Sequence, residues 1–160
     1  PLQPEAAALD HGFALERTYQ ALEDNRDVSR DGRGVWHIKA GSLVRVNLSM
    51  QTPARRYQVA QVDPLPAGLE AVNPELAGSP PTPPGNRQDG WWSSYWFDHQ
   101  NLRDERVEAF TSLLREGVYR YSYLARATTL GEFVDPPTRA EEMYHPETFG
   151  RCASEKVVVE

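Results

Sequence analysis

The chain has 160 residues, of which 39% are hydrophobic and 25% are charged, with a formal net charge of -6 and a pI of about 5.3. This length and composition suit one domain with a hydrophobic core and argue against a disordered chain. The acidic balance, without any run of lysine or arginine, argues against a general nucleic-acid binder.

The cysteine content, the lack of long apolar runs and the start of the sequence bear on the kind of protein to which this domain belongs. Cys152 is the single cysteine, which excludes an intrachain disulfide and a cysteine-based zinc site. No apolar run is long enough to span a bilayer, so we expect no direct membrane insertion of this domain. The sequence begins at Pro1 without a signal peptide, and we expect a piece of a longer protein whose targeting signal lies upstream. Residues 1–12 are predicted as a linker and residues 13–160 as a single domain.

Alternating apolar residues predict strands in the first half of the domain. Residues 12–22 fit either a strand or a short helix, and the polar, glycine-containing residues 24–34 predict a turn. Residues 42–52 carry the clearest strand signal, because apolar and polar side chains alternate there with a period of two. Residues 57–63 predict another strand. The prolines that follow predict a corner over residues 64–70, where the chain leaves the sheet.

The second half of the domain continues this pattern. Residues 78–90 are rich in proline and glycine and predict a loop. Residues 103–114 fit either a helical turn or a strand with Val107, Ala109 and Thr111 on one face. A turn at residues 116–117 precedes a long strand over residues 117–128, and residues 156–160 predict a closing strand. The sequence therefore predicts an all-β fold, an antiparallel β-sandwich with at most short helical insertions.

No pattern of residues indicates catalysis. The sequence lacks HExxH, GxSxG and a phosphate-binding glycine loop, so we expect no catalytic residues and no enzyme. Glu141, Glu142 and Glu147 flank His145, but no paired-ligand spacing supports a metal site, and we expect neither a metal nor another cofactor. The charge run over residues 98–106 favours a solvated face, or ion pairs that fix a loop, over catalytic carboxylates.

An aromatic cluster allows two interpretations. Its members are Trp91, Trp92, Tyr95, Trp96 and Phe97. Exposed together, such rings would stack on sugars, which would suit a carbohydrate- or protein-binding β-sandwich. Buried, they would form core or interdomain packing, because aromatic side chains bury a large area. We favour packing and keep the binding module as the alternative function.

Met143 and Tyr144 lie side by side in the polar, turn-prone stretch AEEMYHPETFGR, residues 140–151, which looks like a loop. They fit either a pair tucked against the sandwich or an exposed apolar plug that covers something on another domain. Methionine fills irregular gaps, and tyrosine adds a rigid ring with a polar tip. Flanking prolines reduce the freedom of the loop, so that docking costs less entropy. The residues alone leave both interpretations open.

Four stretches in order resemble the C-terminal macroglobulin-like domain, MG10, of bacterial alpha-2-macroglobulins. They are VDPLPAGLEAVNPEL, FDHQNLRDERVEAF, YRYSYLARATTLGEF and PPTRAEEMYHPETFGR, residues 62–76, 97–110, 119–133 and 136–151. Each is weakly informative alone, and the ordered set is specific.

The resemblance implies a macroglobulin-like, Ig-like β-sandwich module of a large protease-trapping inhibitor in the periplasm or cell envelope, anchored through a distant N-terminal lipid signal. In members with an internal thioester, this domain packs on the helical domain that carries the bond, and a Met-Tyr loop shields it from water until a bait region is cut. Met143 and Tyr144 match that pair. The implied partners are the helical thioester domain and neighbouring macroglobulin domains of the same chain, and, through the full-length protein, trapped proteases. The candidates for interdomain contacts are charged residues: Asp98, Arg103, Asp104, Arg106, Arg120 and Arg126.

Overall fold

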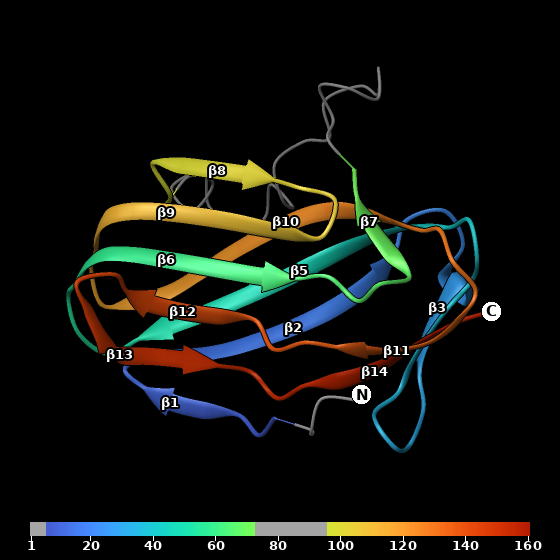
Figure 1. Ribbon diagram of the computed structural model, residues 1–160, viewed down its shortest axis with the longest axis horizontal. Helices are drawn as coiled ribbons and strands as arrows, with labels where there is room; N and C mark the ends of the chain where they lie inside the picture. Colours follow the sequence, from blue (N-terminus) through green and yellow to red (C-terminus); the bar gives the residue numbers. More distant parts are fainter. Residues whose placement is uncertain (1–5, 73–95) are drawn as a thin grey trace.

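The computed structural model describes residues 6–72 and 96–160, and strands dominate both ranges (Figure 1). The strands are β1 (Leu9–His11), β2 (Ala14–Ala21), β3 (Val28–Arg30), β4 (Trp36–Ile38), β5 (Leu43–Thr52), β6 (Arg56–Pro64), β7 (Leu69–Ala71), β8 (His99–Leu102), β9 (Arg106–Leu114), β10 (Gly117–Ala127), β11 (Gly131–Asp135), β12 (Arg139–Glu142), β13 (His145–Arg151) and β14 (Glu155–Val159). One 3-10 helix, η1 (Asn25–Asp27), interrupts them. The predicted all-β fold with at most short helical insertions is confirmed. Within the described ranges, no helix has the length and apolar character needed to cross a bilayer.

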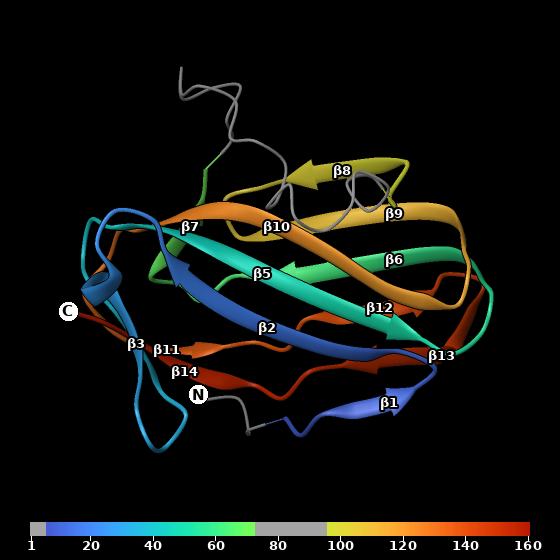
Figure 2. The same ribbon diagram turned by 180° about the vertical axis from the view of Figure 1, so that it is seen from behind.

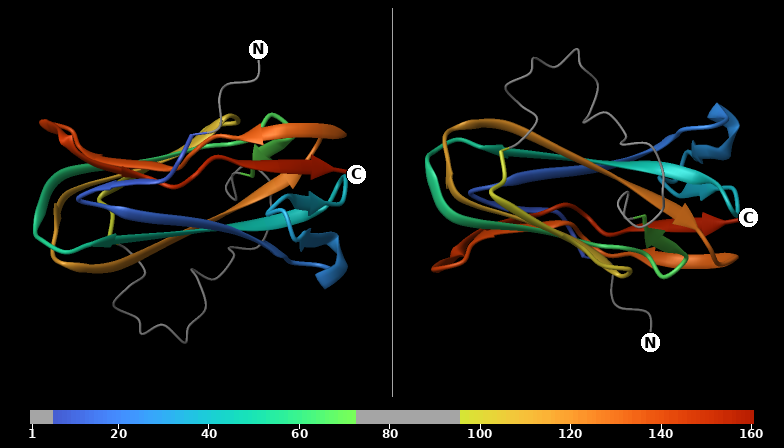
Figure 3. Two further views of the ribbon diagram at one scale, coloured as in Figure 1. Left: turned by 90° about the horizontal axis from the view of Figure 1, so that it is seen from below. Right: turned by 90° about the horizontal axis from the view of Figure 1, so that it is seen from above.

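Two sheets lie face to face and form the sandwich (Figures 1 and 3). The six-stranded sheet has the order β1-β13-β12-β6-β9-β8. The facing four-stranded sheet has the order β2-β5-β10-β7, and its strands β2, β5 and β10 lie in front in Figure 2. A third sheet, β11-β14-β4-β3, closes the end of the sandwich that holds the C-terminus. Among the described strands, pairing is antiparallel except between β14 and β4, which run parallel.

The strands with the clearest alternation lie at the centre of the four-stranded sheet. β5 pairs along most of its length with β10 on one side and with β2 on the other. The inward-facing side chains of β5 and β10 are buried: Val44, Val46, Leu48, Met50, Tyr121, Tyr123, Ala125 and Ala127. Both strands were expected from period-two alternation, and both are confirmed.

The ambiguous segments also form strands. Residues 12–22 contain β2, and residues 103–114 contain β9. Val107, Ala109 and Thr111 lie on one face of β9, as the strand alternative has it, and that face is buried. The strands predicted over residues 57–63 and 156–160 correspond to β6 and β14. Pairing with a sheet therefore decides between helix and strand where the sequence period leaves the choice open.

Several segments contain more strand than the sequence predicts. Leu9–His11, within the predicted linker, pairs with β13 as an edge strand. Residues 69–70 of the predicted corner belong to β7, and the predicted turn over residues 24–34 contains β3. The stretch expected to be a loop over residues 140–151 is largely the hairpin of β12 and β13. The predicted loop over residues 78–90 lies outside the described residues.

A small second core underlies the β12–β13 hairpin. Its buried members come from four strands and the residue before β2: Phe13, Met50, Val59, Leu114 and Ala140. Gly150 of β13 lies directly on the backbone of Phe13, because a Cβ atom at Gly150 would be 1.9 Å from the Phe13 carbonyl oxygen. Any larger residue would push β13 off this core. The hairpin is thus held close to the sandwich.

Candidate functional site

Met143 and Tyr144 form the two-residue connection between β12 and β13, at the end of the sandwich where β6 begins and β9 ends (Figure 1). Glu142 pairs with His145 across the turn. Met143 is 42% exposed and Tyr144 is 78% exposed. The pair therefore stands at the tip of a hairpin and is not tucked against the sandwich.

The turn itself is not the kind that best closes a hairpin. Two-residue hairpin turns favour positive φ angles, which Asn-Gly supplies, but neither Met143 nor Tyr144 has a positive φ. The register also shifts just before the turn, from Glu141 opposite Phe149 to Glu142 opposite His145. This shift leaves residues 146–148 as extra residues on β13. Contacts with neighbouring strands must therefore hold the tip in place.

Strand β6 supplies the contacts nearest the tip. The Met143 N–H donates to the Gln58 carbonyl oxygen over 2.8 Å, which extends the ladder between β12 and β6 to the turn. Below it, Oε1 of the buried Glu142 lies 3.8 Å from Nη1 of Arg56. The guanidinium of Arg56 lies over the Phe13 ring, with Cζ 5.7 Å from the ring centroid. Both charged side chains are largely covered, so that solvent screens their attraction less than it screens a surface pair.

The base of the hairpin is fixed by Thr138 and Cys152. The Cys152 N–H donates to the Thr138 carbonyl oxygen over 3.1 Å, and the Thr138 N–H donates to the Cys152 sulfur over 3.2 Å. The Thr138 hydroxyl donates to Oδ1 of Asp63 over 2.7 Å. Burial raises the pKa of the Cys152 thiol, which suits a structural residue and not a nucleophile.

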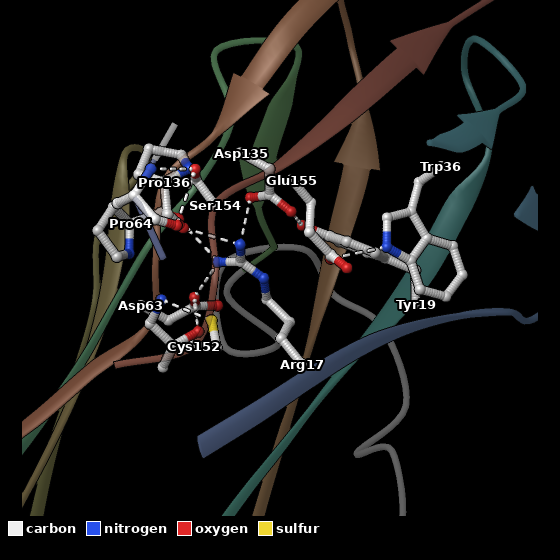
Figure 4. A network of polar contacts seen from close by, with 12 residues as sticks. Arg17, Tyr19, Trp36, Asp63, Pro64, Asp135, Pro136, Cys152, Ser154 and Glu155 are labelled. Atoms are coloured by element: carbon white, nitrogen blue, oxygen red, sulfur yellow. Dashed lines mark hydrogen bonds and ion pairs between the residues drawn. The ribbon is translucent and has the colours of Figure 1, made fainter. Parts of the chain in front are cut away.

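Asp63 belongs to a buried charge cluster between the sheets (Figure 4). Arg17 of β2 lies between two carboxylates: its Nη1 is 2.5 Å from Oδ1 of Asp63, and its Nη2 is 2.8 Å from Oδ1 of Asp135 in β11. The hydroxyl of Tyr19 donates to Asp135 over 2.7 Å, and the hydroxyl of Tyr123 donates to Asp63. The cluster therefore joins strands from all three sheets.

One cation between two carboxylates leaves the cluster with an unbalanced negative charge, which is costly in a buried place. Burial raises the pKa of Asp135 to about 7, against the opposing attraction of Arg17. Burial likewise raises the pKa values of the hydroxyls of Tyr19 and Tyr123, which remain donors. Arg17 is 4% exposed, and both carboxylate residues are less exposed still. A solute does not reach these groups, so we assign the cluster to folding and not to catalysis.

The six charged residues named as contact candidates do not gather at the tip. Arg103 and Asp104 lie exposed in the turn between β8 and β9, and Arg106 follows them with its Nε 2.5 Å from Oε1 of Glu108. Since Arg106 pairs with Pro64 while the hairpin reaches β6 at Val59, this group lies away from the tip along the sheet.

The other three contact candidates are placed separately. Asp98 accepts hydrogen bonds from the backbone N–H and the hydroxyl of Ser112, and the backbone bond is the main cause of its lowered pKa. Arg126 donates to the Gly41 carbonyl oxygen over 3.0 Å, and Arg120 is exposed on β10. Asp98 and Arg126 therefore fix local backbone, as ion pairs and charged hydrogen bonds at a surface commonly do.

The aromatic cluster is described only in part. Trp91, Trp92 and Tyr95 lie outside the described residues. The Trp96 indole donates from Nε1 to the Arg120 carbonyl oxygen over 3.1 Å and packs edge-on against Phe97 and Tyr121. Trp96 also packs against the larger hydrophobic core of the sandwich, to which Tyr121 belongs. For this ring, the arrangement matches core packing and not an open platform.

The described part of the chain contains no group of three His, Cys, Asp or Glu residues placed to hold a metal ion. The exposed His145 lies with its Nδ1 3.6 Å from Oε1 of Glu147. An exposed pair of this kind is an ordinary surface contact.

Sequence reasoning missed the anchors of the hairpin. Arg17 and Glu142 are of types that are mostly exposed, so a strand pattern alone gives little reason to bury them. The sequence does contain one signal. Arg17 lies two residues before Tyr19, and Asp63 lies four residues after Val59, so each charged residue is on the same face of its strand as a buried hydrophobic residue. A charged residue at an inward position of two separate strands is a sign of a buried ion pair.

Comparisons with known proteins agree with this architecture. The sequence matches the family described as the bacterial alpha-2-macroglobulin MG10 domain over residues 12–147. Alpha-2-macroglobulin from Xylella fastidiosa (strain Temecula1) is 32% identical over 97% of this chain, which spans 10% of that relative. Circularly permutated Ras protein 2 from Dictyostelium discoideum is 33% identical over 93% of this chain, which spans 4% of it. The chain thus spans a small part of the curated relatives it matches.

Solved structures show the same fold. Native alpha-2-macroglobulin from Escherichia coli, spanning MG7 to the C-terminus, has a TM-score of 0.78 and 25% identity, over 99% of this chain and 25% of that one. Salmonella alpha-2-macroglobulin reacted with methylamine has a TM-score of 0.76 and 26% identity, over 98% of this chain and 10% of that one.

Proposed function

Because this chain belongs to the bacterial alpha-2-macroglobulin MG10 domain family, we propose that it is a non-enzymatic module of a larger protease-trapping inhibitor. In this proposal, the tip formed by Met143 and Tyr144 packs on the helical thioester domain of the same polypeptide and keeps water from the thioester until a protease cuts the bait region. The observation that carries the proposal is the exposure of two apolar side chains on a tip that neighbouring strands hold in place.

The chemistry of the pair suits a water-excluding contact. A thioester hydrolyses when water reaches it, and a thioether beside an aromatic ring provides an apolar cover. The Tyr144 hydroxyl can hydrogen-bond at the rim of the contact. A tip held by β6 before docking loses little conformational entropy when it docks, so that the contact can be small and still form.

The contact must also release. A projecting two-residue tip offers a modest patch and not a large obligate interface, which suits a domain contact that opens on activation. Two solved relatives are described as Escherichia coli alpha-2-macroglobulin activated by porcine elastase and by trypsin. We infer that proteases likewise act on the full-length protein that contains this chain, and that the partners of this domain are neighbouring domains.

The setting that fits this role is the periplasm or cell envelope of a bacterium, with the full-length protein anchored through a distant N-terminal lipid signal. An inhibitor placed there would meet foreign proteases before they reach the inner membrane. The alternative of a sugar- or protein-binding module gains no support from Trp96, whose ring packs inward.

The test is Tyr144→Gly in the full-length protein, followed by thiol release and methylamine incorporation over time. We expect the variant to lose its thioester, or to react with amine, faster than the parent. The control is Leu130→Gly, which removes a more distant exposed side chain and should leave the rate unchanged. Equal rates in the Tyr144→Gly variant and a thioester-containing parent would overturn the shielding role. Absence of any thioester in the parent would reduce the domain to a scaffold of the protease cage.

A further inference from the structure

A second exposed apolar pair lies next to the tip. Tyr57 of β6 and Leu113 of β9 are directly opposed partners in the six-stranded sheet. Tyr57 is 54% exposed and Leu113 is 43% exposed. Large apolar side chains that are exposed singly are ordinary, but a matched pair beside two further exposed side chains makes a patch.

A local break in the strand alternation turns this pair outward. The inward side chains occur at every second position: Val59, Gln61 and Asp63 in β6, and Val107, Ala109 and Thr111 in β9. The same alternation would place residues 57 and 113 inward, but Leu114 is buried instead of Leu113. The break coincides with Gln58, whose φ of 51° lies in the left-handed region that residues other than glycine rarely adopt. The backbone is therefore strained at the point where two apolar side chains face water, and such strain often marks functional sites.

The strained residue also holds the tip. The Gln58 carbonyl oxygen accepts the hydrogen bond from the Met143 N–H. Tyr57 precedes Gln58 in β6, so this hydrogen bond places the start of the turn beside Tyr57. Leu113 in β9, Tyr57 in β6 and the turn of Met143 and Tyr144 after β12 thus lie at the same end of three adjacent strands of one sheet. We call these four residues the tip patch.

We propose that Tyr57 and Leu113 belong to the docking surface of this domain and meet the same neighbouring domain as Met143 and Tyr144. The inference rests on the proposed function, which supplies the contact at the tip. The tip patch widens that contact from two side chains to four, with tyrosine rings beside aliphatic groups, a composition typical of interface centres.

The occupant we commit to is a domain of the same polypeptide. This chain spans 10% of the Escherichia coli relative and 25% of the solved chain that runs from MG7 to the C-terminus, so most of such a protein lies outside this domain. A tethered neighbour is present at a high effective concentration, and a small patch is therefore enough to hold it. A patch of four side chains is also small enough to release when the molecule rearranges.

Photo-crosslinking in the full-length protein tests the proposal. Leu113→p-benzoylphenylalanine places a crosslinker in the tip patch, and the same change at Tyr144 reports on the tip. The same change at Leu130, which is 68% exposed between β10 and β11, is the matched control. We expect crosslinks from positions 113 and 144 to map to one domain of the same chain, and those from position 130 to map elsewhere.

The outcomes separate this inference from the proposed function. If position 144 reaches the helical domain while position 113 crosslinks to a second copy, to a trapped protease or to nothing, the inference fails and the proposed function stands. If neither position reaches the helical domain, both fail.

A second experiment tests the same contact without a crosslinker, whose bulk could itself disturb the end of the sheet. The double change Tyr57→Thr with Leu113→Thr keeps β-branched residues in the strands while it removes the apolar surface. Hydrogen exchange at residues 140–146 of the native full-length protein should then become about tenfold faster, as expected for the loss of interface side chains. Leu130→Thr should leave that exchange unchanged. Unchanged exchange in the double variant would overturn the inference.

Discussion

The hydroxyl of Thr138 donates a hydrogen bond to Asp63 over 2.7 Å, and this contact joins the base of the β12–β13 hairpin to the charge cluster between the sheets. Two residues earlier, the Pro136 carbonyl oxygen accepts a hydrogen bond from Arg17 over 2.7 Å. The segment from β11 to β12 is therefore held by the same cluster that joins the sheets (Figure 4). A change in the cluster should affect both the stability of the domain and the position of the hairpin.

Removing the cation of the cluster should be strongly destabilising. Arg17→Met leaves the carboxylates of Asp63 and Asp135 buried without a counter-charge, although it keeps an apolar chain of similar length. Breaking a buried ion pair in this way costs about 3–5 kcal/mol. Urea unfolding of the parent and the variant, followed by tryptophan fluorescence, measures the loss.

The matched control for Arg17→Met neutralises the whole cluster. Combining Arg17→Met with Asp63→Asn and Asp135→Asn removes the uncompensated charges, so part of the lost stability should return. A triple variant that is less stable than Arg17→Met alone would show that the hydrogen bonds of the cluster matter more than its charge.

The raised pKa of Asp135 predicts that the free energy of unfolding falls as the pH rises from about 4 to about 7. Its pKa in the folded state is about 7, because burial raises it above the unfolded value of about 3.9. Between these values the folded state keeps a proton that the unfolded state has released, so the free energy of unfolding decreases with rising pH. For one proton the slope is at most about 1.4 kcal/mol per pH unit. Unfolding at pH 5 and pH 8 measures it, and Asp135→Asn should flatten the difference.

Asp31 should make the domain less stable at low pH, the opposite dependence to that of Asp135. Backbone donation from Val35 and the contact with His37 lower the pKa of Asp31 to about 2. This carboxylate contributes stability above its unfolded pKa, and the contribution is lost as the pH falls from about 4 to 2. The domain should therefore be most stable at mildly acidic pH. A maximum above pH 7 would contradict the assignment for Asp135.

Gln61 offers a stabilising substitution. It is 2% exposed, and in the described structure neither atom of its amide group has a hydrogen-bond partner. Burying an unpaired amide is unfavourable, and methionine has a similar length without donors or acceptors. Gln61→Met should raise the free energy of unfolding by about 1 kcal/mol. Gln100→Met is the control, because Gln100 accepts a hydrogen bond from the Tyr121 hydroxyl and should gain nothing when replaced.

The central strands could be predicted from the sequence because their side chains alternate without interruption. β5 and β10 show this alternation over ten residues or more, and their inward positions are the buried ones. Edge strands such as β1 and β7 are three residues long, which is too short for a period to show. These segments are strands because they hydrogen-bond to a longer strand beside them, and the sequence does not show which strand that is.

The candidate site could be predicted only in part. The family resemblance selects Met143 and Tyr144, but the residues around them lack the Asn-Gly or Asp-Gly signal of a tight hairpin, so the sequence predicts a loop where the structure has β12 and β13. Gln58 could not be singled out either, because its left-handed backbone lies where the register of β6 with β9 omits it, and the sequence does not display that register.

The ion pair below the tip should control the order of the hairpin more than the stability of the domain. Glu142→Ala removes the partner of Arg56 and leaves the hydrogen bond from Met143 to Gln58 without support beneath it. We expect hydrogen exchange at Met143 to become about tenfold faster, while the free energy of unfolding falls by only about 1 kcal/mol. Glu141→Ala is the control, because Glu141 pairs with the exposed Arg139 over 3.2 Å on the other face of the strand. Equal exchange at Met143 in both variants would show that the backbone ladder alone holds the tip.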